Sequence, residues 1–150
     1  MFRSGTGLGG ISVAKLFDGP SSIVISDLAQ YTALIDRNIK LNNVDKQCSA
    51  QVVDWCNLPV QQTNYDVILA LECVYREDLY DALLVTLVET SHSETVIFLG
   101  LTRLFAKAVF FTLLEKKGFQ YKKIPQIAMP THTNASADTA IFIVWRGGAT

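Results

Sequence analysis

A run of glycines near the start of the chain constrains its fold more than any other feature. Residues 4–10 read SGTGLGG, which satisfies the pattern G-x-G-x-x-G. In α/β folds such a loop opens a helix and brings backbone N–H groups close to a ligand, since glycine has no obstructing side chain and tolerates positive φ. The pattern alone is weak evidence, because glycine clusters also form structural turns. The loop therefore predicts either a cofactor-binding turn or a structural one.

Helix and strand signals alternate along the rest of the chain. Helical spacing of apolar residues covers 8–17, 31–41, 79–88 and 105–117, and strand-like runs cover 22–26, 50–53, 66–71, 95–99, 119–123 and 140–145. Residues 125–138 have no helical period, so the last two strands are predicted to pair antiparallel. The alternation predicts a single α/β domain over residues 1–150, with helices on both faces of its sheet.

Composition and charge exclude several function classes. The chain is 49% hydrophobic and 18% charged, and its net charge of −1 provides no basic surface for nucleic acid. No apolar run reaches the length of a membrane span, and no apolar stretch of a signal peptide follows the first residues. We expect a monomer in the cytoplasm, and also in the nucleus, that binds neither nucleic acid nor membrane.

Cysteines and histidines predict no metal site. The three cysteines, Cys48, Cys56 and Cys73, form no Cys-x-x-Cys pair. They are interpreted as reduced thiols rather than as a disulfide framework or zinc ligands. His92 and His132 each lie between hydroxyl residues and are expected to be solvated loop histidines rather than ligands or bases.

Polar residues follow several of the predicted strands. Asp27, Asp54, Glu72 and Arg103 stand at or just after successive strand ends. Parallel sheets bind ligands at the carboxyl ends of their strands, so these side chains are candidates for a site. Asp27 offers only acceptors, which suits a ribose diol, and its alternative role is to cap the helix that follows.

Further motifs follow the glycine loop in order. They are Ser26-Asp27-Leu28, the sequence RNIKLN at 37–42, Asp54-Trp55, the sequence YDVIL at 65–69, and Tyr75. Together they resemble the seven-strand S-adenosylmethionine-dependent methyltransferases, above all the methyltransferase-like 21 group of protein-lysine methyltransferases. The resemblance covers Gly5 to Trp145. It implies a Rossmann-like sheet, S-adenosylmethionine as cofactor and a lysine of a protein substrate, with chaperones and translation factors as candidate substrates.

The resemblance also implies which residues contact the cofactor. The glycine loop would lie under the methionine part, Asp27 would hold the ribose, and Trp55 would border the adenine unless it is simply core packing. The end of the strand at 66–71 would contact the methionine end through backbone atoms. The full set is Gly5, Thr6, Gly7, Asp27, Asp54, Trp55, Ala70 and Leu71.

Glu72 and Tyr75 are the catalytic candidates. They match an Asp-x-x-Tyr motif of the resembled group, with Glu in place of Asp. Glu72 would orient the lysine amine by accepting its hydrogens, and Tyr75 would pack on its methylene stem. An apolar channel would lower the pKa of that lysine and favour the neutral, nucleophilic amine. The alternatives are a helix-start acid for Glu72 and a core aromatic for Tyr75.

The start of the chain departs from the resembled pattern. Arg3 stands where the group has its first loop glycine, and the acidic residue and strand before that loop have no counterpart. The expected sheet order is 3-2-1-4-5-7-6, so the missing first strand would be a central one. A truncated methyltransferase is therefore expected. The alternatives are a catalytically inactive, protein-binding fragment or pseudoenzyme and, third, a dinucleotide-binding oxidoreductase.

Overall fold

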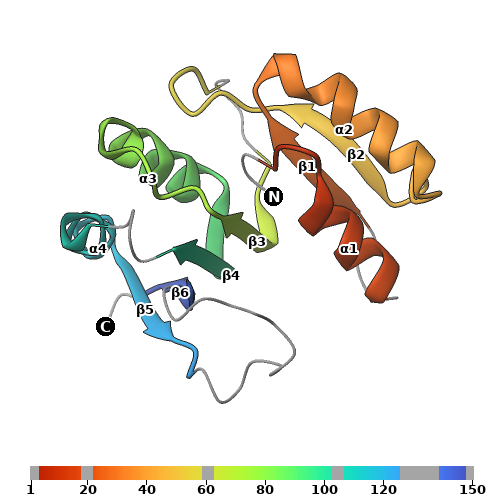
Figure 1. Cartoon of the computed structure of the whole chain (residues 1–150). Helices are drawn as coiled ribbons and strands as arrows, with labels where there is room; N and C mark the ends of the chain where they lie inside the picture. Colours follow the sequence, from red (N-terminus) through yellow and green to blue (C-terminus); the bar gives the residue numbers. More distant parts are fainter. Residues whose placement is uncertain (1–3, 18–21, 59–62, 103–106, 126–138, 148–150) are drawn as a thin grey trace. The chain divides into compact units, whose positions relative to one another are not determined.

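The chain divides into two compact units. A computed structural model describes residues 4–17, 22–58, 63–102, 107–125 and 139–147 (Figure 1). The N-terminal unit comprises residues 1–58 and the C-terminal unit residues 59–150. A single domain over the whole chain stays a prediction.

The N-terminal unit is built around a parallel strand pair. Its elements are α1 (Leu8–Leu16), β1 (Ile23–Asp27), α2 (Ala29–Leu41) and β2 (Cys48–Val52). β1 and β2 pair in parallel, with Asp27 opposite Val52 at their carboxyl ends. α2 connects the two strands, so β1, α2 and β2 form one βαβ unit, and α1 precedes it (Figure 1).

Both helices of this unit contribute to one hydrophobic core. In α2, Ile35 and Ile39 are buried and four residues apart, which places them on the same face of the helix. Ile25 of β1 is fully buried, and it belongs to the same cluster as the apolar residues of the two helices. The cluster consists of Ile11, Ala14, Ile25, Ile35, Ile39, Val44 and Cys48.

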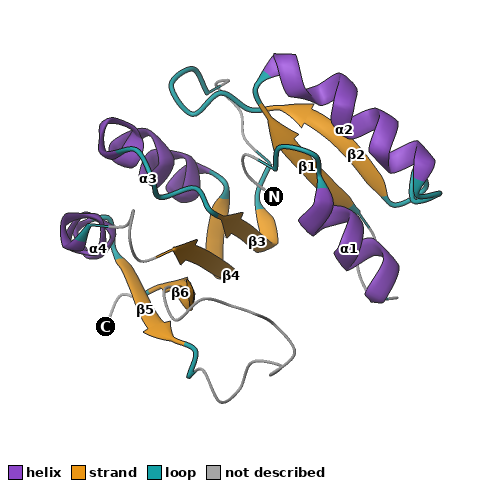
Figure 2. Cartoon of the chain, viewed as in Figure 1, coloured by secondary structure: helices purple, strands orange, loops and turns teal. Residues whose placement is uncertain are grey.

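The C-terminal unit contains a four-stranded mixed sheet. Its elements are β3 (Tyr65–Leu71), a 3₁₀ turn η1 (Glu77–Leu79), α3 (Tyr80–Glu89), β4 (Ser91–Thr102), α4 (Ala108–Lys116), β5 (Phe119–Lys123) and β6 (Thr139–Arg146). The strand order is β3-β4-β6-β5, parallel between β3 and β4 and antiparallel elsewhere (Figure 2). Phe110 of α4 is fully buried and packs edge-on against Tyr80 of α3, with ring centroids 5.1 Å apart.

The alternation of helices and strands confirms the predicted α/β class. The antiparallel pairing of β5 with β6 is also confirmed. The order β3-β4-β6-β5 reproduces the 4-5-7-6 part of the expected sheet, and the β1-β2 pair reproduces its 2-3 part. Among the described residues no strand pairs with the second edge of β1 or of β3, so the expected central strand has no counterpart there.

One strand differs clearly from its prediction. β4 begins at Ser91, four residues before the expected start at Thr95. Its register with β3 is irregular there, because Tyr65 pairs with Ser91 whereas Val67 pairs with Val96. Polar contacts made by His92 and Thr95 hold this irregular start, as described below. Arg103 and residues 105–106 of the predicted fourth helix lie outside the described residues.

The described residues show neither a membrane span nor a metal cluster. None of their helices combines the length and apolar character needed to cross a bilayer. Nor do three or more His, Cys, Asp or Glu side chains gather among them in a way that could hold a metal ion.

The cysteines should differ sharply in reactivity. Cys48 and Cys73 are buried and Cys56 is exposed, all as free thiols. Burial also raises the pKa of the Cys48 thiol, so little thiolate forms there near neutral pH. We expect iodoacetamide at neutral pH to modify Cys56 at least about tenfold faster than the other two. Peptide mass spectrometry over a time course measures this, and equal rates at all three cysteines would show that the described cores are not closed.

Candidate functional site

The glycine loop has the backbone conformation that its sequence predicts. Gly5 and Gly7 adopt φ of 55° and 83°, in the left-handed region that favours glycine. Apart from Gly5 itself and its two chain neighbours, no described residue has a heavy atom within 4 Å of the point where a Cβ on Gly5 would stand. At Gly7 a Cβ would meet Ile35 at 3.3 Å. Gly5 therefore leaves its side of the loop open, whereas Gly7 lets the loop approach the core.

Gly10 has a packing role that the sequence pattern alone does not reveal. A Cβ on Gly10 would stand 2.6 Å from Cγ1 and 2.8 Å from Cδ1 of Ile25. A Cβ at this distance would force Ile25 or α1 to shift, so glycine at this position lets α1 pack closely on β1. The third glycine of G-x-G-x-x-G is the available signal, since that position permits close packing of the helix on the strand.

The loop is fastened by residues from β1 and α2. The Ser4 hydroxyl and backbone N–H donate to the Ser26 carbonyl at 2.8 and 3.2 Å. The Asn38 side-chain amide donates to the Thr6 carbonyl at 2.8 Å. Asn38 belongs to the RNIKLN motif, and the structure now assigns it this role in holding the loop.

Asp27 joins the end of β1 to the glycine loop. Its Oδ2 accepts the Gly5 N–H at 2.8 Å and its Oδ1 accepts the Leu28 N–H at 2.7 Å. α2 has Leu28 at its N-cap position and no side-chain cap, so the cap alternative for Asp27 is wrong. Only 3% of Asp27 is exposed. Each oxygen keeps one acceptor position, and the ribose contact stays a prediction.

Asp54 and Trp55 follow β2 beside the end of β1. The Val53 N–H donates to the Asp27 carbonyl at 2.9 Å, which joins the two strand ends. Asp54 accepts the Cys56 N–H at 3.0 Å and the Asn57 side-chain amide at 2.9 Å, and these bonds fix the turn that follows. Trp55 is buried, which fits its alternative role in packing, and its adenine contact stays a prediction.

The predicted site residues therefore fall into two groups. The N-terminal unit brings together the glycine loop and the carboxyl ends of its two strands. That group consists of Gly5, Thr6, Gly7, Asp27, Asp54 and Trp55. The C-terminal unit holds Ala70, Leu71, Glu72 and Tyr75 at and after the carboxyl end of β3.

In the C-terminal unit, the segment after β3 presents polar and aromatic groups to solvent. Tyr75 is 44% exposed, so it is not a core aromatic. Glu72 is exposed and has φ of 53°. Its helix-start alternative is wrong, because the next helical turn begins at Glu77 with Arg76 as its N-cap. Ala70, by contrast, is fully buried within β3.

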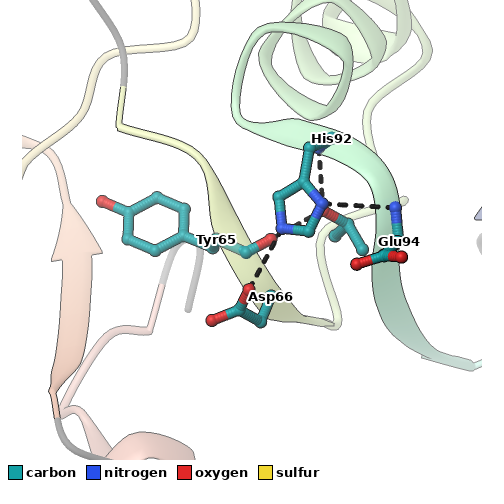
Figure 3. Close-up of polar contacts among 5 residues, drawn as sticks. Tyr65, Asp66, His92 and Glu94 are labelled. Carbon is teal, nitrogen blue, oxygen red and sulfur yellow. Dashed lines mark hydrogen bonds and ion pairs between the residues drawn. The ribbon is translucent and has the colours of Figure 1, made fainter.

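His92 lies in a polar cluster at the opposite end of the same sheet. Its Nε2 is 3.1 Å from Oδ1 of Asp66, and its Nδ1 accepts the Glu94 N–H at 3.2 Å (Figure 3). The Thr95 hydroxyl accepts the His92 N–H and donates to the Tyr65 carbonyl at 2.8 and 2.6 Å. The expectation of a solvated loop histidine is therefore wrong for His92, because these bonds hold it in β4. His132 lies outside the described residues.

This cluster is separate from the candidate site of its unit. Asp66 stands at the amino end of β3, whereas Glu72 follows its carboxyl end. Because Nδ1 of His92 accepts a backbone N–H, the neutral ring carries its proton on Nε2 and donates to Asp66. Hydrogen bonds of this cluster thus join the irregular start of β4 to β3.

Sequence comparison identifies the family. The model of a lysine methyltransferase family matches residues 2–117. The protein-lysine N-methyltransferase EFM6 of Saccharomyces cerevisiae is 31% identical over 104 residues, in a match covering 59% of this chain and 42% of EFM6. The chain thus spans less than half the length of this curated relative.

Solved structures share the fold. A TehB-like S-adenosylmethionine-dependent methyltransferase from Corynebacterium glutamicum matches with a TM-score of 0.73 and 13% identity, over 97% of this chain and 78% of that one. The mitomycin 7-O-methyltransferase MmcR matches with a TM-score of 0.78 and 13% identity, over 97% and 48%. At such identities these matches show the Rossmann-like fold alone. Because the family model spans most of the chain, including the glycine loop and Asp27, this chain belongs to the lysine methyltransferase family.

Proposed function

We propose that the chain transfers a methyl group from S-adenosylmethionine to a lysine side chain of a protein substrate. The observation that carries this proposal is the glycine loop, held in a left-handed conformation and joined to Asp27 at the end of β1. The family match and the similarity to EFM6 support lysine as the acceptor. A dinucleotide-binding oxidoreductase, the third alternative, gains no support from either.

The residues present fit S-adenosylmethionine. Gly5 leaves open the space that a side chain would fill, and Asp27 keeps acceptor capacity at the end of β1. When bound, this cofactor supplies an electrophilic methyl group on a positively charged sulfur. We propose that Gly5, Thr6, Gly7 and the strand-end residues of the N-terminal unit hold it, and a cofactor contact of the Ala70 and Leu71 backbone stays a prediction.

The protein's task in this reaction is placement. The lysine amine must lose its proton and approach in line with the bond that breaks. Glu72 is exposed and can accept the amine hydrogens, and the exposed ring of Tyr75 can pack along the methylene stem. Fixing two reactants in this way contributes several kcal/mol, about 7 or more in favourable cases.

The substrate and the cellular setting belong to the same proposal. We propose a chaperone or a translation factor as substrate, and a monomer acting in the cytoplasm and the nucleus. The balanced composition, with a net charge of −1, supports a protein rather than a nucleic-acid partner.

Methyl transfer to a defined panel tests the proposal. The 150-residue chain is incubated with S-adenosylmethionine labelled in its methyl group and a panel of purified, unmethylated chaperones and translation factors. We expect label on lysine in at least one of them, mapped by peptide mass spectrometry, and none after prior chemical blocking of its lysines. A folded chain that labels nothing would overturn the proposal, and stable binding of a panel protein without transfer would favour the inactive, protein-binding alternative.

A further inference from the structure

The backbone of Glu72 is held in an uncommon conformation. Its φ of 53° lies in the left-handed region, which long side chains rarely adopt. Its N–H donates to the Gly100 carbonyl at 2.8 Å, a bond that completes the last β3–β4 pair, Leu71 with Gly100. These two features fix the direction in which the Glu72 side chain leaves the strand.

The side chain of Glu72 is held from the neighbouring strand. The Thr102 hydroxyl, at the carboxyl end of β4, lies 3.1 Å from Oε1 and 3.2 Å from Oε2 of Glu72. Threonine is branched at Cβ, so its hydroxyl has few orientations on a strand. A hydroxyl of restricted orientation, that of Thr102, therefore donates to the carboxylate at the end of the flexible Glu72 side chain.

The Glu72 carboxylate keeps part of its hydrogen-bond acceptor capacity. Two other acids follow it, and each is paired: Glu77 with Lys107, and Asp78 with Arg76. The hydrogen bond that Arg76 donates to Asp78 lowers the pKa of Asp78, and the one that Lys107 donates to Glu77 raises the pKa of Lys107. No ion pair among the described residues involves Glu72, and one hydroxyl donor occupies only part of a carboxylate's acceptor capacity.

We propose that Thr102 is a positioning residue of the methyl-transfer site, whose hydroxyl holds the Glu72 carboxylate in the orientation that receives the lysine amine. This inference rests on the proposed function. Thr102 acts through Glu72 and contacts neither the cofactor nor the lysine. Glu has one more rotatable bond than Asp, so its carboxylate can adopt more positions. The hydrogen bond from Thr102 restricts these positions and offsets the added conformational freedom.

Three threonine substitutions separate positioning from structural support. T102V removes the hydroxyl at nearly constant shape, T102S keeps it, and T112V removes a hydroxyl from an exposed position on α4. With the substrate found in the panel, we expect T102V to lower kcat about tenfold, as for loss of one hydrogen bond to a charged group. KM for S-adenosylmethionine should not change. T102S and T112V should stay within about twofold of the wild type.

A double-substitution cycle tests whether Thr102 acts through Glu72. In an E72Q background, T102V should cause no further loss of kcat, because the carboxylate that it positions is already gone. An equal tenfold loss in both backgrounds, or wild-type kcat in T102V alone, would overturn the inference.

A measurement on the resting protein distinguishes failure of this inference from failure of the proposed function. In the wild type and T102S, the two Glu72 Hγ protons should have distinct NMR shifts, because the side chain is held in one conformation. In T102V these shifts should converge, and unchanged shifts would overturn the positioning role even if methyl transfer occurs. Ordered Glu72 protons in a chain without transferase activity would instead support the positioning and refute the proposed function.

Discussion

Replacing Asp27 by alanine is expected to weaken S-adenosylmethionine binding by about 100-fold. The carboxylate accepts the N–H groups of Gly5 and Leu28, and it is almost fully buried. Hydrogen bonds to a charged group contribute about 1.5 kcal/mol or more each, so loss of both costs at least about 3 kcal/mol. If this energy is needed to hold the loop in its binding conformation, the affinity falls by about two orders of magnitude. Titration calorimetry of the purified variant measures the change.

Two variants control for this effect. D27N keeps one acceptor but turns an amide NH₂ toward the second N–H, so we expect an intermediate loss of about tenfold. D36A removes a carboxylate from an exposed position of α2 and should leave the affinity unchanged. Wild-type affinity in a folded D27A variant would mean that Asp27 neither contacts the cofactor nor holds a loop that does.

Replacing Gly10 by valine should destabilise the N-terminal unit by about 3 kcal/mol, the upper range for overpacking a core. Even a Cβ would stand 2.6 Å from Ile25, which is fully buried and cannot move aside freely. Intrinsic helix propensity favours valine slightly over glycine, so any loss of stability reports the clash rather than the helix. Urea unfolding followed by labelling of Cys48 measures this unit, because Cys48 belongs to its core.

Two further substitutions sharpen the test at Gly10. K15V places valine at an exposed position of the same helix and should change stability by less than about 0.5 kcal/mol. Ile25→Val removes Cδ1, so the pair G10A/I25V should lose less than the sum of its single losses. Strict additivity, or a stable G10V variant, would show that α1 does not pack on β1 through this glycine.

Elements with local signals could be predicted from sequence. The spacing of Ile35 and Ile39 defines the buried face of α2, and the residues after them end that helix as expected. At the C-terminal side, β5 has the predicted bounds, and Gly118 at φ of 85° ends the preceding helix. Each of these signals involves residues that are close in the sequence, so it can be recognised without knowledge of the fold.

Contacts between distant residues could not be predicted. Asp27 was identifiable as a candidate ligand, but its bond to Gly5 joins positions 22 residues apart. Thr102 and Glu72 are separated by 30 residues and meet only because β3 and β4 end side by side. The start of β4 depends likewise on bonds that cross to β3. One sequence gives composition and spacing, whereas these pairings depend on strand register.

Calorimetric titration of the folded 150-residue chain with S-adenosylmethionine is the most direct measurement. A cofactor site built on the glycine loop and Asp27 requires saturable binding of one molecule per chain, strongly reduced in D27A and unchanged in D36A. Absence of binding by a chain whose circular dichroism and protected Cys48 and Cys73 show that it is folded would refute the methyltransferase assignment of this chain's activity.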